Sequence, residues 1–210
     1  MPHLIANQPA VSAPELSDRE VMAAVADGQE AAFEELMGRK TKPLLGLAYR
    51  VIGDREEAKD IVQLTFLKVW EHRSRYNRRY SVNTWIYRIA TNLAIDLLRS
   101  RQVRGEQTVP VRHHLMHVIS RRSDVEGVFR KEVFRILRDL ATGLSRKQRL
   151  AFLLREVEGM SSKEVAEILD CRQSTVRHHL FVARQYLRRE VCRRFPEYAA
   201  EFRAAAGEPR

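Results

Sequence analysis

Residues 81–101 read SVNTWIYRIATNLAIDLLRSR and predict one long amphipathic helix. Its apolar residues recur at steps of three and four, which is the spacing of a buried helical face. They are Ile86, Ile89, Ala90, Leu93, Ala94, Leu97 and Leu98. A second stripe at the same spacing holds Trp85, Arg88, Asn92, Asp96 and Arg99. An aromatic ring, two guanidiniums and an amide beside an apolar face raise the question of what this helix binds.

The rest of the chain also has helical periodicity. Helix-start signals occur at Ser17, Asp54, Ser145 and Ser161, each followed three residues later by Glu or Gln. The predicted helices span 18–26, 29–52, 55–76, 83–101, 125–141, 146–157, 162–169 and 173–193. Pro43 is expected to kink or interrupt the second. No alternating strand pattern is found, so the predicted fold is all-α.

Two small helical domains are predicted, joined by a flexible linker. Residues 102–124 contain Gly105, Pro110 and many basic residues with weak periodicity, which is typical of a linker. The first domain is placed at 15–101 and the second at 125–194. Residues 1–14 are expected to be a disordered tail, and 195–210 a short C-terminal tail.

Charge divides the chain of 210 residues, whose net charge is +10, into unlike segments. Residues 15–71 hold eight basic and twelve acidic side chains, residues 72–131 hold thirteen and four, and residues 145–194 hold twelve and six. This distribution predicts one surface for a protein partner and two for a polyanion such as nucleic acid. Solvated basic faces without a ligand are the plainer interpretation.

Composition also bears on where the protein works. No apolar run approaches the roughly 20 residues that span a bilayer. The N-terminus lacks the pattern of a secretion signal. Cys171 and Cys192 are the two cysteines, without CxxC spacing, and are expected to be reduced thiols. The sequence therefore predicts a cytoplasmic protein with no membrane insertion.

Residues 54–76 form a helix with an unusual outer face. Its core face holds Ala58, Ile61, Val62, Thr65, Phe66 and Val69. The opposite face holds Asp60, Leu64, Leu67 and Glu71. Two leucines framed by carboxylates on the wet side indicate a protein-docking stripe, although two ordinary exposed leucines are an alternative.

Residues 161–189 have helix-turn-helix spacing. A short helix ends before the turn at residues 170–172, and a longer helix follows. The second helix exposes side chains of the types that reach bases and phosphates in a major groove: Arg172, Gln173, Ser174, Arg177, His178, Phe181 and Arg184. A helical bundle whose last helix is merely basic is the alternative.

Aromatic and basic residues alternate around the start of the opening helix. The aromatic residues are Tyr76, Tyr80, Trp85 and Tyr87, and the basic ones are Arg75, Arg78, Arg79 and Arg88. This interleaving suits a single strand, because rings stack on unpaired bases while guanidiniums follow the backbone. Trp85 and Tyr87 as core edges remain the alternative.

Catalytic and metal-binding patterns are weak. His113 and His117 of the HHLMH run would share a helical face, but no acidic or thiolate ligand lies near them, so neither a zinc site nor a cofactor is expected. The sequence shows no nucleophile–base motif or phosphate-cradling glycine loop, so an enzyme is not expected.

Five segments in order resemble a bacterial extracytoplasmic-function (ECF) sigma factor of the sigma-70 family. They are AFEELMGRK (32–40), GDREEAKDIVQLTFLKVW (53–70), TWIYRIATNLAIDLLR (84–99), LSRKQRLAFLLREVEGMSSKEVAEIL (144–169) and STVRHHLFVARQYLR (174–188). The resemblance covers region 2 (about 15–101) and region 4 (about 125–192), roughly 80% of the chain.

The resemblance implies a subunit that directs core RNA polymerase to promoters. It implies that the β′ clamp helices bind Asp60, Gln63, Leu64, Leu67 and Glu71, and that region 4 meets the β flap. The opened −10 non-template strand would be read by Arg78, Arg79, Tyr80, Asn83, Trp85, Arg88, Asn92 and Arg99. The −35 duplex would be read by Arg172, Gln173, Ser174, Thr175, Arg177, His178, Phe181 and Arg184. Family members are commonly held by an anti-sigma factor, and one is expected here.

This chain departs from the family pattern at several positions. Leu64 stands where an acidic residue is usual, and Val82 where an aromatic one is frequent. Asp170 replaces the usual turn glycine, and Asp tolerates the left-handed conformation better than most residues. His179 replaces Arg or Lys, which weakens phosphate contacts. The linker is more basic than in many members of the family.

Geometry predicts that the free protein binds promoters weakly. Elements about 25 base pairs apart lie roughly 85 Å apart at about 3.4 Å per step. A free 23-residue linker averages only about 26 Å between its ends. An autonomous helix-turn-helix repressor or activator is the competing hypothesis, and it predicts a palindromic site.

Overall fold

The computed structural model describes residues 16–104, 143–194 and 196, and every regular element within them is helical. In chain order they are α1 (Asp18–Ala26), α2 (Glu30–Ile52), α3 (Arg55–Glu71), the 3₁₀ turn η1 (Arg73–Arg75), α4 (Val82–Val103), α6 (Arg146–Phe152), the π-helical turn η4 (Leu153–Val157), α7 (Ser162–Ile168) and α8 (Gln173–Arg194). The all-α prediction is confirmed. The helix predicted at 125–141 and the linker from residue 105 onward lie outside the described residues.

Serine capping boxes set three of the helix starts. At Ser17, Ser145 and Ser161 the hydroxyl accepts the backbone N–H of the third helical residue, whose side chain accepts the backbone N–H of the serine. Each box satisfies two N–H groups that helix geometry leaves without a partner. Asp54 caps α3 by accepting from the backbone N–H groups of Glu56 and Glu57, at 2.9 and 3.0 Å. The capping signals in the sequence therefore mark real helix starts.

The predicted helices around Pro43 and before residue 76 differ clearly from the structure. Helix α2 runs through Pro43 from Glu30 to Ile52, so the interruption considered there does not occur. Leu36 and Leu44, on either side of the proline, are both fully buried, and their packing outweighs the single hydrogen bond that proline removes. The helix predicted to reach residue 76 ends at Glu71, and η1 begins a loop there.

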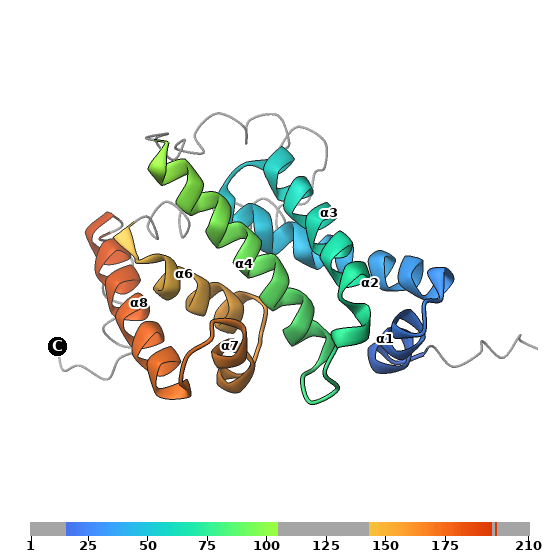
Figure 1. Ribbon diagram of the computed structural model, residues 1–210. Helices are drawn as coiled ribbons and strands as arrows, with labels where there is room; N and C mark the ends of the chain where they lie inside the picture. The colour runs from blue at the N-terminus through green and yellow to red at the C-terminus, as the bar shows by residue number, and fades with distance from the viewer. Residues whose placement is uncertain (1–15, 105–142, 195, 197–210) are drawn as a thin grey trace, which may run out of the picture.

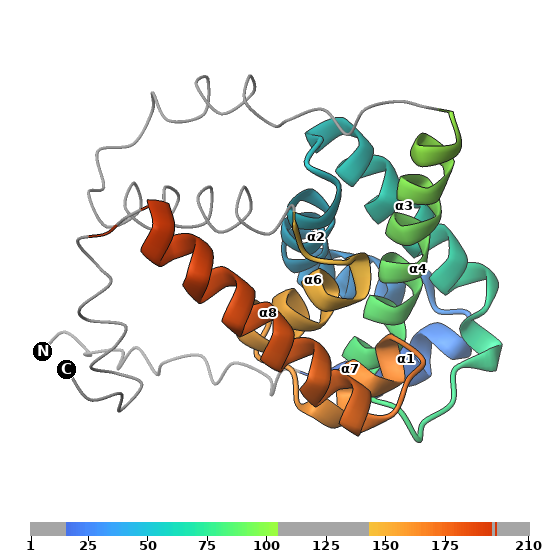
Figure 2. The same ribbon diagram turned by 90° about the vertical axis from the view of Figure 1, so that its left-hand side faces the viewer.

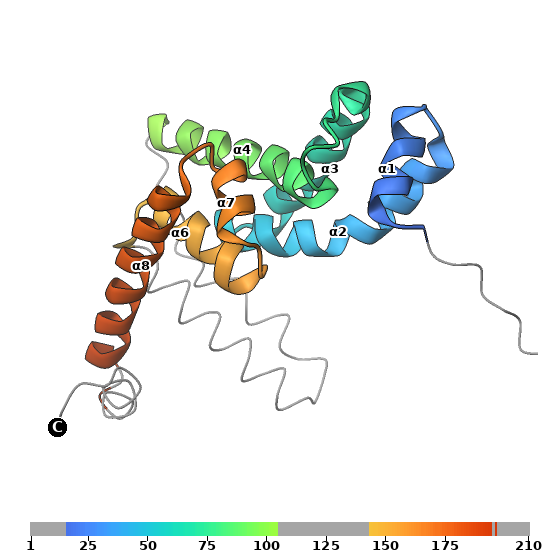
Figure 3. The ribbon, with the colours of Figure 1, turned by 90° about the horizontal axis from the view of Figure 1, so that it is seen from below.

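Helix α4 lies between the two groups of helices, with α1–α3 on one side and α6–α8 on the other (Figure 1). It packs on α2 and α3, and it also packs on α7 from the second domain. One continuous buried cluster joins both groups and contains Ile86 of α4 and Val165 of α7. Helix α8 starts beside α7, and its C-terminal end points away from α1–α4 (Figures 2 and 3). The two domains are thus in direct contact.

None of the helices in the described part of the chain is both long and apolar enough to cross a membrane.

Helix α1 is anchored to α2 through Asp18. The Asp18 carboxylate accepts from Arg39 Nη1 at 3.1 Å and also from the ammonium of Lys40. Burial opposes ionisation of Asp18, but the hydrogen bonds from Lys40 and Arg39 outweigh it and hold the pKa of the carboxyl below its ordinary value of 3.8. Val21, Met22 and Val25 complete the attachment, since all three are fully buried.

Replacing Asp18 with Asn should therefore destabilise the fold at neutral pH by about 1–2 kcal/mol, because charge-assisted hydrogen bonds are lost. The folded-state pKa is depressed, so the wild-type advantage should persist above pH 3.8 and disappear as the pH falls through that lower pKa. Urea unfolding from pH 7 down to pH 2 measures the difference. The matched control is Asp27→Asn at the other end of α1, and a pH-independent difference for Asp18→Asn would contradict the assignment.

Candidate nucleic-acid interface

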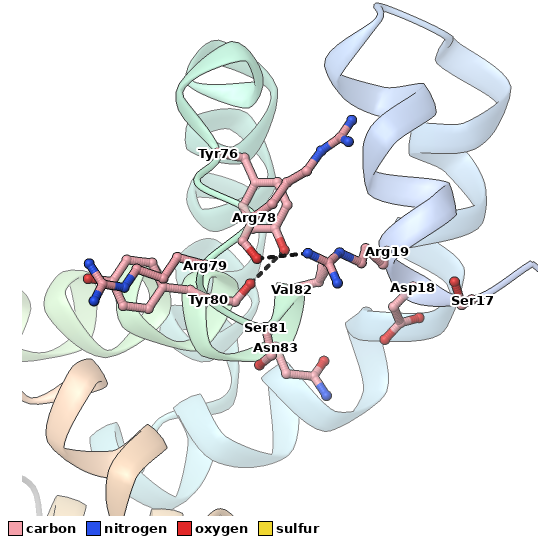
Figure 4. A pocket seen from close by; sticks show the side chains of 10 residues that line it. All are labelled: Ser17, Asp18, Arg19, Tyr76, Arg78, Arg79, Tyr80, Ser81, Val82 and Asn83. Carbon is pink, nitrogen blue, oxygen red and sulfur yellow. Dashed lines mark hydrogen bonds between the residues drawn. The ribbon is translucent and has the colours of Figure 1, made fainter.

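The loop between η1 and α4 is held in one shape by its own hydrogen bonds. Arg79 N donates to Asn77 Oδ1 at 2.9 Å, and Tyr80 N donates to the Asn77 carbonyl at 3.0 Å. The Tyr76 hydroxyl donates to the Tyr80 carbonyl at 2.8 Å, which closes the loop on itself. Ser81 then caps α4 by accepting from Thr84 N at 3.0 Å. The basic loop side chains are thus presented from an ordered backbone (Figure 4).

A cavity of about 420 Å³ opens beside this loop. Its volume falls in the range of roughly 300–1,000 Å³ that small-ligand clefts occupy. The lining residues are Ser17, Asp18, Arg19, Tyr76, Arg78, Arg79, Tyr80, Ser81, Val82 and Asn83. Four of the predicted −10 residues (Arg78, Arg79, Tyr80 and Asn83) therefore gather around one hollow. The contribution of α1 was missed, because nothing in its sequence pattern indicates which loop it will meet.

The aromatic side chains near the loop divide into two kinds. Tyr76 packs on Trp85 with ring centroids 5.2 Å apart, and Trp85 is half-buried. Tyr87 is buried, and its hydroxyl donates to Glu158 Oε2 at 3.2 Å. Burial and then the neighbouring Glu158 carboxylate raise the pKa of the Tyr87 phenol, so it stays protonated. Of the two interpretations of Tyr87, the core edge is the one that the structure supports.

The polar stripe of α4 continues from the loop along an open surface. Asn92 and Arg99 are exposed, and Arg99 Nη1 lies 3.4 Å from Asp96 Oδ1. Arg88 is half-buried, with Nη2 3.5 Å from Asp170 Oδ1 of the second domain. Trp85, Arg88, Asn92 and Arg99 therefore share a face, as their spacing predicts, but the end nearest the loop also borders the helix-turn-helix.

The residues of the predicted docking stripe lie on the outer face of α3. Asp60, Gln63, Leu64, Leu67 and Glu71 are all exposed, with Leu64 at 44% and Leu67 at 52%. All six residues predicted for the core face are buried. The stripe lies on a helix whose other side is anchored in the core, so its side chains project from a rigid backbone.

Helices α7 and α8 form the predicted helix-turn-helix. Asp170 has φ +50°, so the turn adopts the left-handed conformation that a glycine usually takes. Seven of the eight predicted −35 residues are exposed, with Phe181 at 58%, and Thr175 is half-buried. Arg184 Nη2 is held by Glu156 Oε1 at 2.6 Å. These side chains line the open face of α8.

His179 lies on a different part of α8 from the exposed set. Burial lowers the pKa of its imidazole, and the charges of His178 and Lys147 act in the same direction. His179 is therefore neutral at physiological pH, where an Arg or Lys would be charged. Weaker phosphate contact at this position stays a prediction.

Metal and thiol chemistry has little support in the described ranges. No group of three or more His, Cys, Asp or Glu side chains there is arranged to hold a metal ion. Cys171 and Cys192 are free and half-buried. The HHLMH run lies in residues 105–142, outside the ranges that the structure describes.

Two family models match the chain: Sigma-70 region 2 over residues 36–104, and Sigma-70 region 4 over residues 134–187. The chain is 29% identical over 188 residues to the ECF RNA polymerase sigma-E factor of Haemophilus influenzae, a match that covers 85% of this chain and 97% of that protein. It is 26% identical over 175 residues to the ECF RNA polymerase sigma factor SigW of Bacillus subtilis, covering 80% and 92%.

Two solved structures share the fold. CnrH in complex with the cytosolic domain of CnrY has a TM-score of 0.61 at 23% identity, covering 81% of this chain and 94% of that one. RpoE in complex with the anti-sigma factor NepR from Bartonella quintana has a TM-score of 0.60 at 21% identity, covering 75% and 94%. The order of the helices in this chain is thus found in other structures.

Proposed function

The chain belongs to the sigma-70 family as an ECF sigma factor, a promoter-specific initiation factor of RNA polymerase, and we propose that three of its surfaces each bind a different partner. The stripe on α3 binds core polymerase. The loop 76–81 with α4 reads the opened −10 strand, and α8 reads the −35 duplex. The observation that carries this assignment is the ordered, basic pocket beside the loop, whose lining residues include none from the helix-turn-helix.

The docking stripe should meet the clamp helices of the polymerase β′ subunit. It combines exposed leucines with carboxylates, so a partner surface that is apolar at its centre and basic at its edge fits it. Leu64 makes this contact less charged than in most of the family. Region 4 is expected to meet the β flap.

Leu67→Glu should weaken binding to core polymerase by at least about tenfold, or about 1.4 kcal/mol, because a carboxylate replaces an apolar contact at the interface. The fold should be unchanged, since Leu67 is exposed. Anisotropy with labelled protein and core polymerase measures the affinity. Val103→Glu is the control, because it also replaces an exposed apolar side chain with a carboxylate. Equal affinities of the two variants for core polymerase would show that the stripe is not part of the interface.

The α4 surface should act on the strand after it has opened. Unpaired bases offer faces for stacking and edges for hydrogen bonds, and an amide such as that of Asn92 both donates and accepts. Trp85 is assigned to this surface with its neighbours, and its packing on Tyr76 also braces the loop.

Asn92→Ala is expected to lower open-complex formation more than initial closed binding, since its amide would contact an unpaired base. Permanganate reactivity and gel shifts with reconstituted holoenzyme separate the two steps. Ser100→Ala, at an exposed position further along α4, is the control. A parallel loss in both assays would place Asn92 in duplex binding instead.

The α8 surface should read the −35 element as duplex, with arginines that pair with guanine edges or phosphates. Replacing Arg177 with Ala should cost about 1–3 kcal/mol of −35 binding if this residue reads a base. Transcription from matched and −35-scrambled promoters tests this, with Arg189→Ala at the far end of α8 as control. If Arg177→Ala retains the full preference for the matched promoter, Arg177 does not read the element.

Partners beyond polymerase and promoter follow from the family. The solved structure of the sigma factor RpoE holds the anti-sigma factor NepR, and that of CnrH holds the cytosolic domain of CnrY. We propose that an anti-sigma factor antagonises this chain as well. We also propose that the chain works in the cytoplasm and supplies specificity without a catalytic site of its own.

Run-off transcription with core polymerase on a genomic fragment library tests the whole assignment. Specific transcripts should depend on both core polymerase and this protein. Specific binding to a palindromic duplex site without polymerase would favour an autonomous helix-turn-helix regulator instead.

A further inference from the structure

One wall of the cavity beside loop 76–81 comes from α1, which is distant in sequence from the loop. Ser17, Asp18 and Arg19 line the hollow opposite Arg78 and Tyr80 (Figure 4). No pattern in residues 15–30 predicted this contact, and α1 lies outside the segment that matches the region 2 model. The helix therefore adds a feature to the pocket that the family comparison leaves unassigned.

Arg19 holds the tip of the loop directly. Its Nη2 donates to the Arg78 carbonyl at 3.1 Å, across 59 positions of sequence. The Tyr76 hydroxyl donates to the Tyr80 carbonyl, and the two hydrogen bonds appear together in Figure 4. The backbone of residues 78–80 is therefore held by two separate side chains.

The backbone that carries Arg19 is itself rigidly placed. Asp18, its neighbour, is bound by Lys40 and Arg39, and Val21 and Met22 are fully buried. The Arg19 side chain thus extends from a backbone whose position is fixed. A side chain placed in this way keeps a binding site in its productive geometry.

We propose that Arg19 is a positioning residue of the −10 pocket, fixing the loop so that one position of the opened strand is read selectively. This rests on the proposed function of the loop. An unpaired nucleotide entering the hollow would meet the side chains of α1 on one side and those of the loop on the other, so the fit of the base depends on where α1 holds the Arg78 carbonyl.

The test is a selection with holoenzyme on promoter fragments whose −10 window is randomised. Wild-type protein should enrich a preferred base at each position that is read. Arg19→Ala should reduce the preference at one position by about fivefold or more and leave the others unchanged, while the melting temperature stays at the wild-type value. Arg19→Lys should restore part of the preference, because an ammonium can also donate to the carbonyl.

Arg55→Ala is the matched control, since it removes the same charge at the N-terminal end of α3, whereas the loop follows the C-terminal end. An Arg19→Ala profile equal to that of wild type would overturn the proposal. An equal loss at every position together with a lower melting temperature would also overturn it, because Arg19 would then support only the fold. If wild-type holoenzyme itself shows no preference in the window, the proposed function of the loop fails as well.

Glu158 forms a separate polar contact between the two domains. Its side chain is only 10% exposed and pairs with the guanidinium of Arg50 from α2, while the Tyr87 hydroxyl of α4 donates to the same carboxylate. A Cβ at Gly46 would lie 3.2 Å from Arg50 Nη1, so the glycine leaves room for this guanidinium. Glu158 is thus held by two helices of the first domain.

Further polar contacts join the two domains. Arg88 of the −10 surface lies 3.5 Å from Asp170 in the helix-turn-helix turn, and Arg146 Nη2 donates to the Leu98 carbonyl at 3.4 Å. The helix-turn-helix therefore lies, through α7 and its turn, against the −10 reading helix. Promoter elements roughly 85 Å apart, at about 3.4 Å per step, cannot both be bound in this arrangement.

We infer that Glu158 is the central residue of a clasp that holds the two DNA-reading domains closed until core polymerase separates them. Only the open form can engage two distant promoter elements at once. The apparent affinity for core polymerase is then the intrinsic affinity multiplied by the fraction of protein that is open.

Fluorescence energy transfer in the full chain tests the clasp, with dyes on Ser74→Cys and Cys192 in a Cys171→Ser background. Glu158→Gln should lower the closed-to-open ratio at least tenfold, and apparent affinity for core polymerase should rise as the open fraction rises. Exchanging the charges, Arg50→Glu with Glu158→Arg, should restore the closed form. Glu167→Gln on α7 is the control for loss of a carboxylate.

Equal energy transfer in wild type and Glu158→Gln would overturn the clasp. A charge exchange that leaves the domains open would also overturn it, because the direct pairing would then not be the cause. Neither outcome affects the assignment of the three binding surfaces, which transcription measures independently.

Discussion

Burial of helix α4 between two groups of helices is the constraint on which the rest of the structure depends. Ile86, Ala90 and Ala94 are almost completely buried, and the two alanines are small enough for neighbouring helices to approach closely. With this face buried, the stripe through Asn92 and Arg99 is left open to solvent. The register of one helix therefore decides both what the core contains and which polar groups remain available to a strand of DNA.

The loop before α4 and the turn before α8 are each ordered by a small number of interactions at defined positions. The loop before α4 is shaped by its own hydrogen bonds and closed by Tyr76 and Arg19, whereas the turn before α8 relies on a residue that tolerates positive φ. Both segments begin from elements that are anchored in the core. Their backbones are consequently ordered before any ligand arrives, which lowers the cost of ordering these segments on binding.

The separation of charge along the chain matches the separation of surfaces in space. The acidic first segment contributes the stripe on α3, while the basic segments contribute the loop and α8. Contacts with nucleic acid phosphates release counterions and so depend steeply on salt. A contact through the leucine-centred stripe would depend mainly on apolar burial and would be less sensitive to salt. One small protein can thus hold a protein partner and a polyanion through different physical forces.

Much of the fold, and of the pattern of buried and exposed residues on the proposed binding surfaces, was predictable from the sequence, because helix periodicity and capping act over three or four residues. The helix starts at Ser17, Ser145 and Ser161, the buried face of α3 and the exposed set on α8 all follow from such short spacings. The continuity of α2 through Pro43 did not follow, since burial of its leucines outweighs the local effect of proline.

The sequence by itself determined which residues form helices, which faces are apolar and which side chains are of the kinds that bind DNA or polymerase. Only the tertiary structure decided which of these faces meet. Arg19 reaches a loop 59 positions away, and Arg50 reaches Glu158 across 108 positions. Contacts at such separations depend on how whole helices pack, because no local propensity encodes the position of one helix relative to another.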